Sequence, residues 1–227
     1  MVRTRATSPA DTFDRFPKET LAFLRALAAN NTRTWFAEHK SDYRGALKDP
    51  AEQFSAAMSR KFERLTGQRH RSKIYRIHRD LRFAKDKSPY NTHLHISFTP
   101  EGARGTPPAW MFGVDPARLT LGVGIFAFEP PVLDIYRNRV RQADGSRLHK
   151  LIERMRSTGI RVDAPDLKRV PAGFDADAAP GDLLHRKGLT AWIDHDNPEV
   201  IATGKLIERC MDDFMRLTPL FDWLIKL

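Results

Sequence analysis

The chain has 227 residues, of which 41% are hydrophobic and 29% charged, and 38 Lys and Arg against 28 Asp and Glu give a formal net charge of +10. This composition is typical of a globular protein and excludes collagen-like, disulfide-stapled and wholly disordered chains. The single cysteine, Cys210, excludes an internal disulfide, and no apolar run approaches the length of about 18 residues that a membrane span needs. We therefore expect a cytoplasmic protein with no membrane partner.

The first third of the chain has the pattern of helices. Residues 1–15 predict a disordered tail. Apolar side chains then recur every three or four residues, between residue types that favour helix starts and stops. The expected helices cover residues 17–30, 35–46 and 49–67. In the third of them, Asp49 is expected to cap the start through its side chain and Gly67 to end the helix.

The middle of the chain predicts strands joined by short connections, which favour antiparallel pairing. The expected strands cover residues 74–83, 93–98, 109–114, 119–128 and 188–193. In the first of them apolar and polar residues alternate, so Tyr75, Ile77 and Phe83 would share a buried face. Between the third and fourth strands, Asp115 and Pro116 predict a tight turn.

Helices return towards the C-terminus, around a loop over residues 163–182. They are expected over residues 130–140, 144–159, 197–214 and 218–227. Asp144 and Asn197 are expected to cap two of them, and Pro219 to start the last. The chain is therefore expected to be an α+β protein with a mostly antiparallel central sheet flanked by N-terminal and C-terminal helices, and residues 16–227 are expected to form a single domain.

Positive charge is concentrated in one segment. Residues 60–93 carry eleven Lys and Arg against three Asp and Glu, a local net charge of +8. Residues 175–227 carry ten acidic residues against six basic ones, a local net charge of −4. Such polarisation predicts an anion-attracting region, whereas scattered surface Arg and Lys need no function beyond solubility.

The candidate site lies in the basic segment. If residues 74–83 and 93–98 pair as a hairpin, their polar faces meet, and Arg side chains there can hold phosphate or carboxylate in a planar fork. The predicted ligand-binding residues are Arg76, Arg79, Arg82, Lys85, Lys87 and Tyr90, and the candidates for proton transfer are His93, Asp86 and Asp80. The alternative is that Asp80 and Asp86 pair with neighbouring basic residues only to brace the hairpin.

The same segment carries a family resemblance. The pattern Arg-Asp-x-Arg-Phe-x-Lys-Asp-Lys-Ser-Pro-Tyr at Arg79 to Tyr90, together with Asn31, Arg33, Trp35, Phe36, His39 and Lys40, resembles the bacterial and fungal family known as domain of unknown function 2461. The resemblance runs from about Phe16 to the C-terminus and includes the Arg186-Lys187 pair. It implies a single α+β domain, and it implies no reaction, cofactor or catalytic residue.

Three other motifs have simpler explanations than function. His78, His93 and His95 offer an alternative transition-metal site, but the surrounding basic residues oppose a cation, so no metal or other cofactor is assigned. Gly122 and Gly124 match a dinucleotide fingerprint but lie inside an alternating run, which indicates close packing on a strand. The sequence from Asp194 to Asp196 is explained by turn chemistry, and Cys210 by burial as a structural thiol.

Two functions follow from these features. The first is an anion-binding domain, with or without catalysis, that takes a small phosphate- or carboxylate-bearing ligand. The second is a nucleic-acid-binding module that uses residues 60–93 to follow the phosphates, with Tyr75 or Tyr90 available for stacking and with a steep dependence on salt. A structural or scaffold domain without a catalytic site is a further alternative, because basic composition alone does not choose among these classes.

Overall fold

The computed structural model describes residues 13–103, 105–175 and 177–227, and it confirms the α+β class. In these ranges six strands form one antiparallel sheet in the order β1-β2-β3-β4-β6-β5. The strands are β1 (His70–Ile74), β2 (Leu94–Pro100), β3 (Ala109–Val114), β4 (Leu119–Ile125), β5 (Arg161–Val162) and β6 (Leu189–His195). None of the described helices is both long enough and apolar enough to cross a membrane.

The chain divides into two compact units. The first comprises Met1–Phe98, Met111–Thr120 and His195–Asp212, and the second comprises Thr99–Trp110, Leu121–Asp194 and Asp213–Leu227. The first contains α1 (Glu19–Ala29), α2 (Arg33–Glu38), α3 (Lys40–Asp42), α4 (Asp49–Thr66) and a 3-10 helix (Pro198–Ala202). The second contains α5 (Pro130–Val140), α6 (Ala143–Ser157) and a 3-10 helix (Leu183–His185), and α7 (Leu206–Leu224) supplies residues to both.

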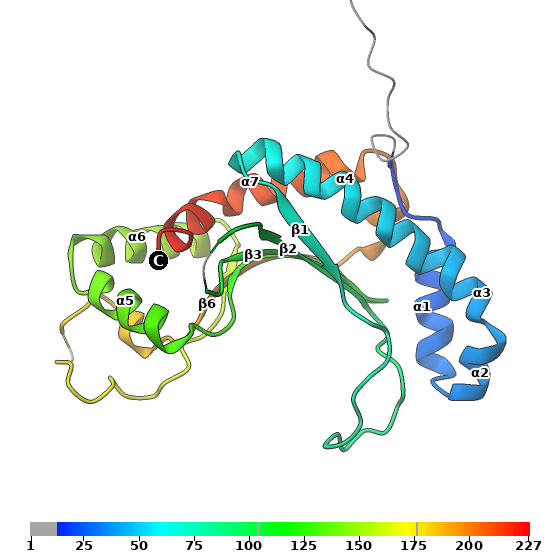
Figure 1. Ribbon diagram of the computed structural model, residues 1–227, viewed down its shortest axis with the longest axis horizontal. Helices are drawn as coiled ribbons and strands as arrows, with labels where there is room; N and C mark the ends of the chain where they lie inside the picture. Colours follow the sequence, from blue (N-terminus) through cyan, green and yellow to red (C-terminus); the bar gives the residue numbers. More distant parts are fainter. Residues whose placement is uncertain (1–12, 104, 176) are drawn as a thin grey trace, which may run out of the picture. The chain divides into compact units, whose positions relative to one another are not determined.

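The core of the first unit lies between α4 and the strands beside it. Phe54 and Phe62 of α4 are fully buried. Phe62 packs on Phe98 of β2, with ring centroids 5.0 Å apart, and Phe54 packs on Phe112 of β3 at 4.5 Å. Figure 1 shows α4, in cyan, lying along strand β1. This packing covers one face of these strands and explains the helical spacing of apolar residues in α4.

Only part of the predicted tail is described, and the N-terminal helices agree in part with the predicted ones. Residues 1–12 of the tail lie outside the described residues, and Asp14 bonds to the backbone of Lys205 and Leu206. The expectation that Asp49 caps a separate helix is wrong, because a π-helical turn (Tyr43–Lys48) runs into α4 without a break. The predicted end of α4 is confirmed, since Gly67 is left-handed, with a φ of 73°.

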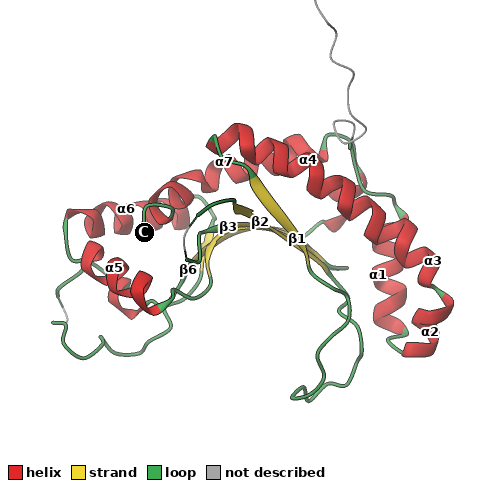
Figure 2. Ribbon diagram, viewed as in Figure 1, coloured by secondary structure: helices red, strands yellow, loops and turns green. Residues whose placement is uncertain are grey.

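The strand expected over residues 74–83 is wrong in position. Strand β1 ends at Ile74, and Figure 2 shows the following segment as loop. Only single bonds continue the pairing, from the Tyr75 amide to the His95 carbonyl and through an isolated bridge between His78 and Tyr90. Beyond this bridge no neighbouring strand is present to cover an apolar face, so Phe83 is 96% exposed. Of the residues predicted to share the buried face, Ile77 is buried, whereas Tyr75 is 47% exposed.

The glycines of the dinucleotide fingerprint serve packing within β4, as the alternating pattern predicts. A Cβ at Gly122 would collide with the indole of Trp192 in β6. A Cβ at Gly124, which has a φ of 148°, would collide with the backbone at Leu189. Glycine therefore lets β6 approach β4 closely, and the fingerprint lacks the helix start that a phosphate site requires.

The C-terminal helices differ from the predicted ones. Asn197 does cap a helix, but this is the short 3-10 helix. The predicted long helix does not continue from it, because Lys205 has a left-handed backbone with a φ of 65°. The long helix α7 begins only at Leu206 and continues through Pro219. Pro219 removes one helical hydrogen bond, the one to the carbonyl of Met215, and α7 continues on both sides of it.

The expected cap of the helix after residue 140 is also wrong. The N-cap position of α6 is Gln142, and Asp144 lies in the first turn. Its carboxylate accepts hydrogen bonds from Arg139, with the closest N–O distance 2.7 Å. The hydrogen bonds and charge of Arg139 hold the pKa of Asp144 below its usual value.

Candidate functional site

A cavity of about 330 Å³ lies where the connection between β1 and β2 leaves the sheet, within the first unit. It is lined by Tyr75, Arg76, His78, Arg79, Asp80, Asn91, His93 and His95. The connection extends well beyond both strands in Figure 1. The cavity therefore combines side chains from the start and the end of one long loop with the first residues of β2.

Two stacked histidines form one wall. The rings of His93 and His95 lie with centroids 3.9 Å apart. His95 also lies against Gly113 of β3, where a Cβ would come within 3.0 Å of its Cδ2 atom, so glycine makes room for the imidazole. Partial desolvation of the imidazole lowers the pKa of His95 to about 4, although the residue retains exposed surface; the nearby His93 adds to this, and Asp115 opposes it. Desolvation also lowers the pKa of His93, so both rings are neutral at pH 7.

The loop is anchored to α2 through Tyr90. The Asn31 side chain bonds twice to the Tyr90 backbone, donating from Nδ2 to the carbonyl at 2.9 Å and accepting from the amide at Oδ1 at 3.1 Å. The Tyr90 ring is only 6% exposed and stacks on Phe36 at a centroid distance of 4.1 Å. These contacts fix the returning half of the loop just before His93.

Ion pairs brace the rest of the loop. Nη1 of Arg79 donates to Asp86 at 2.5 Å and to the Ser88 carbonyl at 3.0 Å. Hydrogen bonds from Ser88, and then that from Arg79, lower the pKa of Asp86 to about 2. Hydrogen bonds from Arg82 lower the pKa of Asp80 in the same way. Both carboxylates are ionised at pH 7, so neither is suited to donate a proton there.

The cavity contains one uncommitted cation. The guanidinium of Arg76 has no hydrogen-bond or ion-pair partner among the residues that the structure describes, and the residue is exposed. Arg79 is held by the loop, and the Asp80 carboxylate is paired with Arg82 at 2.7 Å, while its charge also acts on Arg76 without a hydrogen bond between them. With both histidines neutral, the charge that is free to meet a ligand is that of Arg76.

The predicted site residues divide into two groups. The structure brings together Arg76, Arg79, Asp80, His78, His93 and His95 around the cavity. Outside its lining lie Arg82, Lys85, Asp86, Lys87 and Tyr90. Of these, Lys87 donates to the Leu81 carbonyl at 3.1 Å and Tyr90 is buried. Sequence analysis did not place Asn91 in the site, and it assigned Tyr75 to a buried face; only the pairing of the two loop halves brings them to the cavity.

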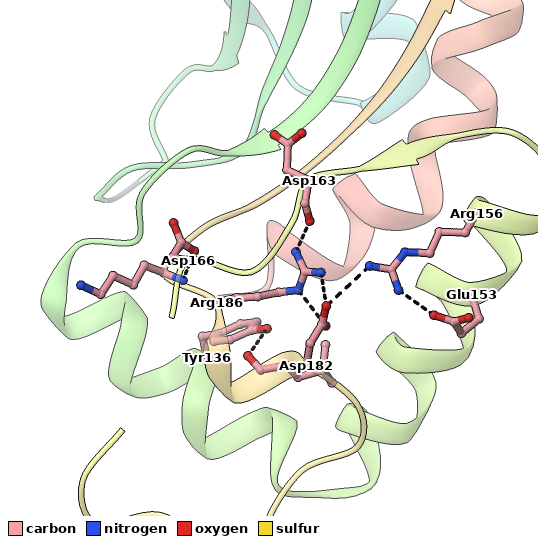
Figure 3. Close-up of polar contacts among 9 residues, drawn as sticks. Tyr136, Glu153, Arg156, Asp163, Asp166, Asp182 and Arg186 are labelled. Atoms are coloured by element: carbon pink, nitrogen blue, oxygen red, sulfur yellow. Dashed lines mark hydrogen bonds and ion pairs between the residues drawn. The ribbon is translucent and has the colours of Figure 1, made fainter. Parts of the chain in front are cut away.

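A second polar cluster, in the second unit, was not singled out as a site from the sequence. Figure 3 shows Arg186, which is 1% exposed, bonding to Asp182 and to the Asp163 carbonyl. Its Nε and Nη2 donate to the two Asp182 oxygens at 3.1 and 2.8 Å, and Arg156 lies 3.5 Å from the same carboxylate. Each of the three nitrogens of the buried guanidinium therefore donates a hydrogen bond within the protein, which compensates for its burial.

The geometry of His93 and His95 differs from that of a metal site. Among the described residues, no group of three or more His, Cys, Asp or Glu side chains is arranged to hold a metal ion. His93 and His95 lie face to face in a stack, whereas metal ligands direct their ring nitrogens to one point. The arrangement therefore offers ring surfaces rather than a coordination sphere.

The lowered histidine pKa gives a direct test of the cavity. Titration of the imidazole protons by NMR is expected to show His95 with a midpoint near pH 4, well below the ordinary value of 6.5. Because the folded state resists protonation, the unfolded chain binds more protons between these values, and stability falls as the pH drops from 6.5 towards 4. The variant His95→Gln should weaken this pH dependence. A His95 midpoint at 6 or above would show that the imidazole is fully hydrated, contradicting the packed stack.

Comparison with known proteins assigns the family. None of the curated proteins compared with the chain matches it. The sequence profile described as "Conserved hypothetical protein (DUF2461)" matches residues 19–223, which is most of the chain. This range contains the sheet, the whole cavity and the helices except the last residue of α7, so the match covers both the fold and the candidate site. The protein therefore belongs to the DUF2461 family of conserved hypothetical proteins.

Proposed function

We propose that the protein binds a small anionic ligand, bearing phosphate or carboxylate, in the cavity between the two halves of the β1–β2 connection. The observation that carries the proposal is the uncommitted guanidinium of Arg76 in a lining whose one carboxylate, Asp80, is already paired with Arg82. Arginine binds such groups through two parallel N–H bonds.

The neutral histidines support the same function. A neutral imidazole has one N–H donor and one acceptor nitrogen, so His93 can donate a hydrogen bond to an anion or accept a proton from a ligand group. Its pKa is lowered by desolvation and by Arg79, and raised by Asp115. Of the three candidates for proton transfer, Asp80 and Asp86 are kept ionised by the hydrogen bonds that they accept. His93 is the candidate in the cavity that is not ionised in this way. Any catalysis at the site would use this residue.

The test is the loss of binding on removal of the free cation. In calorimetric titrations with ribose 5-phosphate and with citrate, Arg76→Ala is expected to weaken binding of whichever anion binds by about 10- to 100-fold, because a hydrogen bond to a charged group contributes about 1.5–3 kcal/mol. Lys85→Ala is the matched control, since it removes one positive charge from the same loop but outside the cavity. It should leave the affinity nearly unchanged.

Other outcomes contradict the proposal. Equal losses in the two variants would mean that the anions respond to the general charge of the loop. Binding of oligonucleotides alone, with an affinity that falls steeply as salt is added, would support the nucleic-acid-binding alternative over residues 60–93. No binding of any anion to a folded protein would leave the scaffold alternative.

A further inference from the structure

The volume of the cavity is too large for an inorganic anion alone. A molecule of liquid water takes about 30 Å³, so a space of about 330 Å³ corresponds to roughly ten water molecules. Cavities that bind organic ligands begin at about 300 Å³. A phosphate or carboxylate on Arg76 would therefore occupy only part of the space, and the ligand is expected to carry an additional group.

Aromatic rings line the part of the cavity that an anion bound to Arg76 would leave empty. Tyr75 follows β1 directly, lines the cavity and is 47% exposed, so part of its ring is accessible to a ligand. The ammonium of Lys73 lies 4.7 Å from its ring centroid, which holds the phenol in place from one side. The His93–His95 stack and the ring of His78 complete the set.

Flat rings around one free cation favour a ligand that is itself flat and charged. Stacking on an aromatic side chain stabilises a bound nucleobase by about 1–3 kcal/mol, and the interaction accepts any base. The neutral state of His93 and His95 matters because a protonated imidazole pair would repel itself and be strongly hydrated. The charges that face the pair are those of Arg76, Arg79 and Asp80 from the loop and Asp115 from the β3–β4 turn.

We propose that the additional group is a heterocyclic ring and that the ligand is a nucleoside monophosphate, with its base against Tyr75 and its phosphate on Arg76. The proposal rests on the proposed function, and it adds the class of ligand. It differs from the nucleic-acid-binding alternative, because the ligand is a single nucleotide held in the cavity rather than a strand that follows residues 60–93.

The experiment compares AMP with ribose 5-phosphate, which carries the same phosphate and sugar without the base. Calorimetric titration of the wild-type protein is expected to show AMP binding about tenfold or more tightly. Tyr75→Ala should abolish this preference and leave the affinity for ribose 5-phosphate unchanged. Phe83→Ala is the matched control, because it removes an exposed ring from the same loop outside the cavity, and it should keep the preference.

The outcomes separate the two proposals. Equal binding of AMP and ribose 5-phosphate, or a preference that survives Tyr75→Ala, would overturn the nucleotide assignment and leave the anion site standing. Failure of all phosphate and carboxylate compounds to bind would overturn both. A 5′-phosphorylated tetra-adenylate that binds much more tightly than AMP would overturn a mononucleotide site in favour of a strand, and equal or weaker binding supports the proposal.

Discussion

Replacing Arg186 by Met is expected to lower the free energy of unfolding by about 1.5–3 kcal/mol, because the substitution removes the hydrogen bonds of a buried guanidinium to the partly buried carboxylate of Asp182. Arg186 is 1% exposed, and its guanidinium donates to both oxygens of Asp182 and, at 2.7 Å, to the Asp163 carbonyl (Figure 3). Methionine fills a similar volume but offers no donor to either group. Urea denaturation followed by circular dichroism measures the change.

Two further variants separate the lost pair from lost packing. Arg147→Met removes an arginine that is 79% exposed and lies 3.5 Å from Asp144, so it should change stability by less than about 0.5 kcal/mol. The double variant Arg186→Met with Asp182→Leu removes the stranded carboxylate and should recover part of the loss. If the double variant loses as much stability as Arg186→Met and Asp182→Leu lose separately when their losses are added, packing rather than the unpaired charge dominates.

The same pair predicts a dependence on pH. Burial raises the pKa of Asp182, but the hydrogen bonds and charges of Arg186 and Arg156 outweigh it, so the pKa lies below the ordinary value of 3.8. A depressed pKa in the folded state means that the pair stabilises the protein fully above the unfolded pKa and loses its contribution as the pH falls through the folded one. The difference in stability between wild type and Arg186→Met should therefore shrink below about pH 4.

Truncation of Tyr90 to Ala is expected to cost about 3–5 kcal/mol and to abolish anion binding, because this ring holds the cavity loop against α2. The ring is 6% exposed, stacks on Phe36 at 4.1 Å, and its backbone is clamped by Asn31. Without it, the segment before His93 loses its anchor. Urea denaturation gives the stability, and titration with ribose 5-phosphate gives the binding.

Tyr90→Phe distinguishes support from ligand binding. It keeps the stacked ring and removes only the hydroxyl, so stability and affinity should both remain close to those of the wild type. If Tyr90→Phe weakened binding without changing stability, the hydroxyl would contact the ligand, in agreement with the prediction that Tyr90 is a ligand-binding residue. Bracing the loop would then be only part of the role of Tyr90.

Physical features of short range explain why some predictions succeeded. The helical repeat of Phe54 and Phe62, the left-handed Gly67 and the Asp115 turn depend on residues within a few positions of each other. Such features survive whatever surrounds them. The alternation of the buried Leu94 and Ile96 with the exposed His95 likewise marked the start of β2 correctly, whereas Ser97, on the face of His95, is buried.

The errors have the opposite origin. Alternation alone suggested a strand as far as Phe83, but a strand requires a neighbour, and the chain after Tyr75 has only isolated bonds to its return segment. Pro219 looked like a helix start, yet α7 passes through it, because the packing of the rest of the helix outweighs one lost hydrogen bond. In both cases the outcome depended on contacts far along the chain.

For the candidate site, the sequence by itself determined which basic and histidine side chains are present, and the tertiary structure decided which of them are available to a ligand. Composition and pattern were sufficient to gather basic residues and histidines in one segment and to give the α+β class. Only the folded loop showed that, among the described residues, Arg79 and Arg82 are held in ion pairs while the guanidinium of Arg76 has no hydrogen-bond or ion-pair partner. The reason is that residue types fix which interactions are available, whereas partners, burial and pKa depend on atoms brought together from distant positions, as Arg186 with Asp163 also shows.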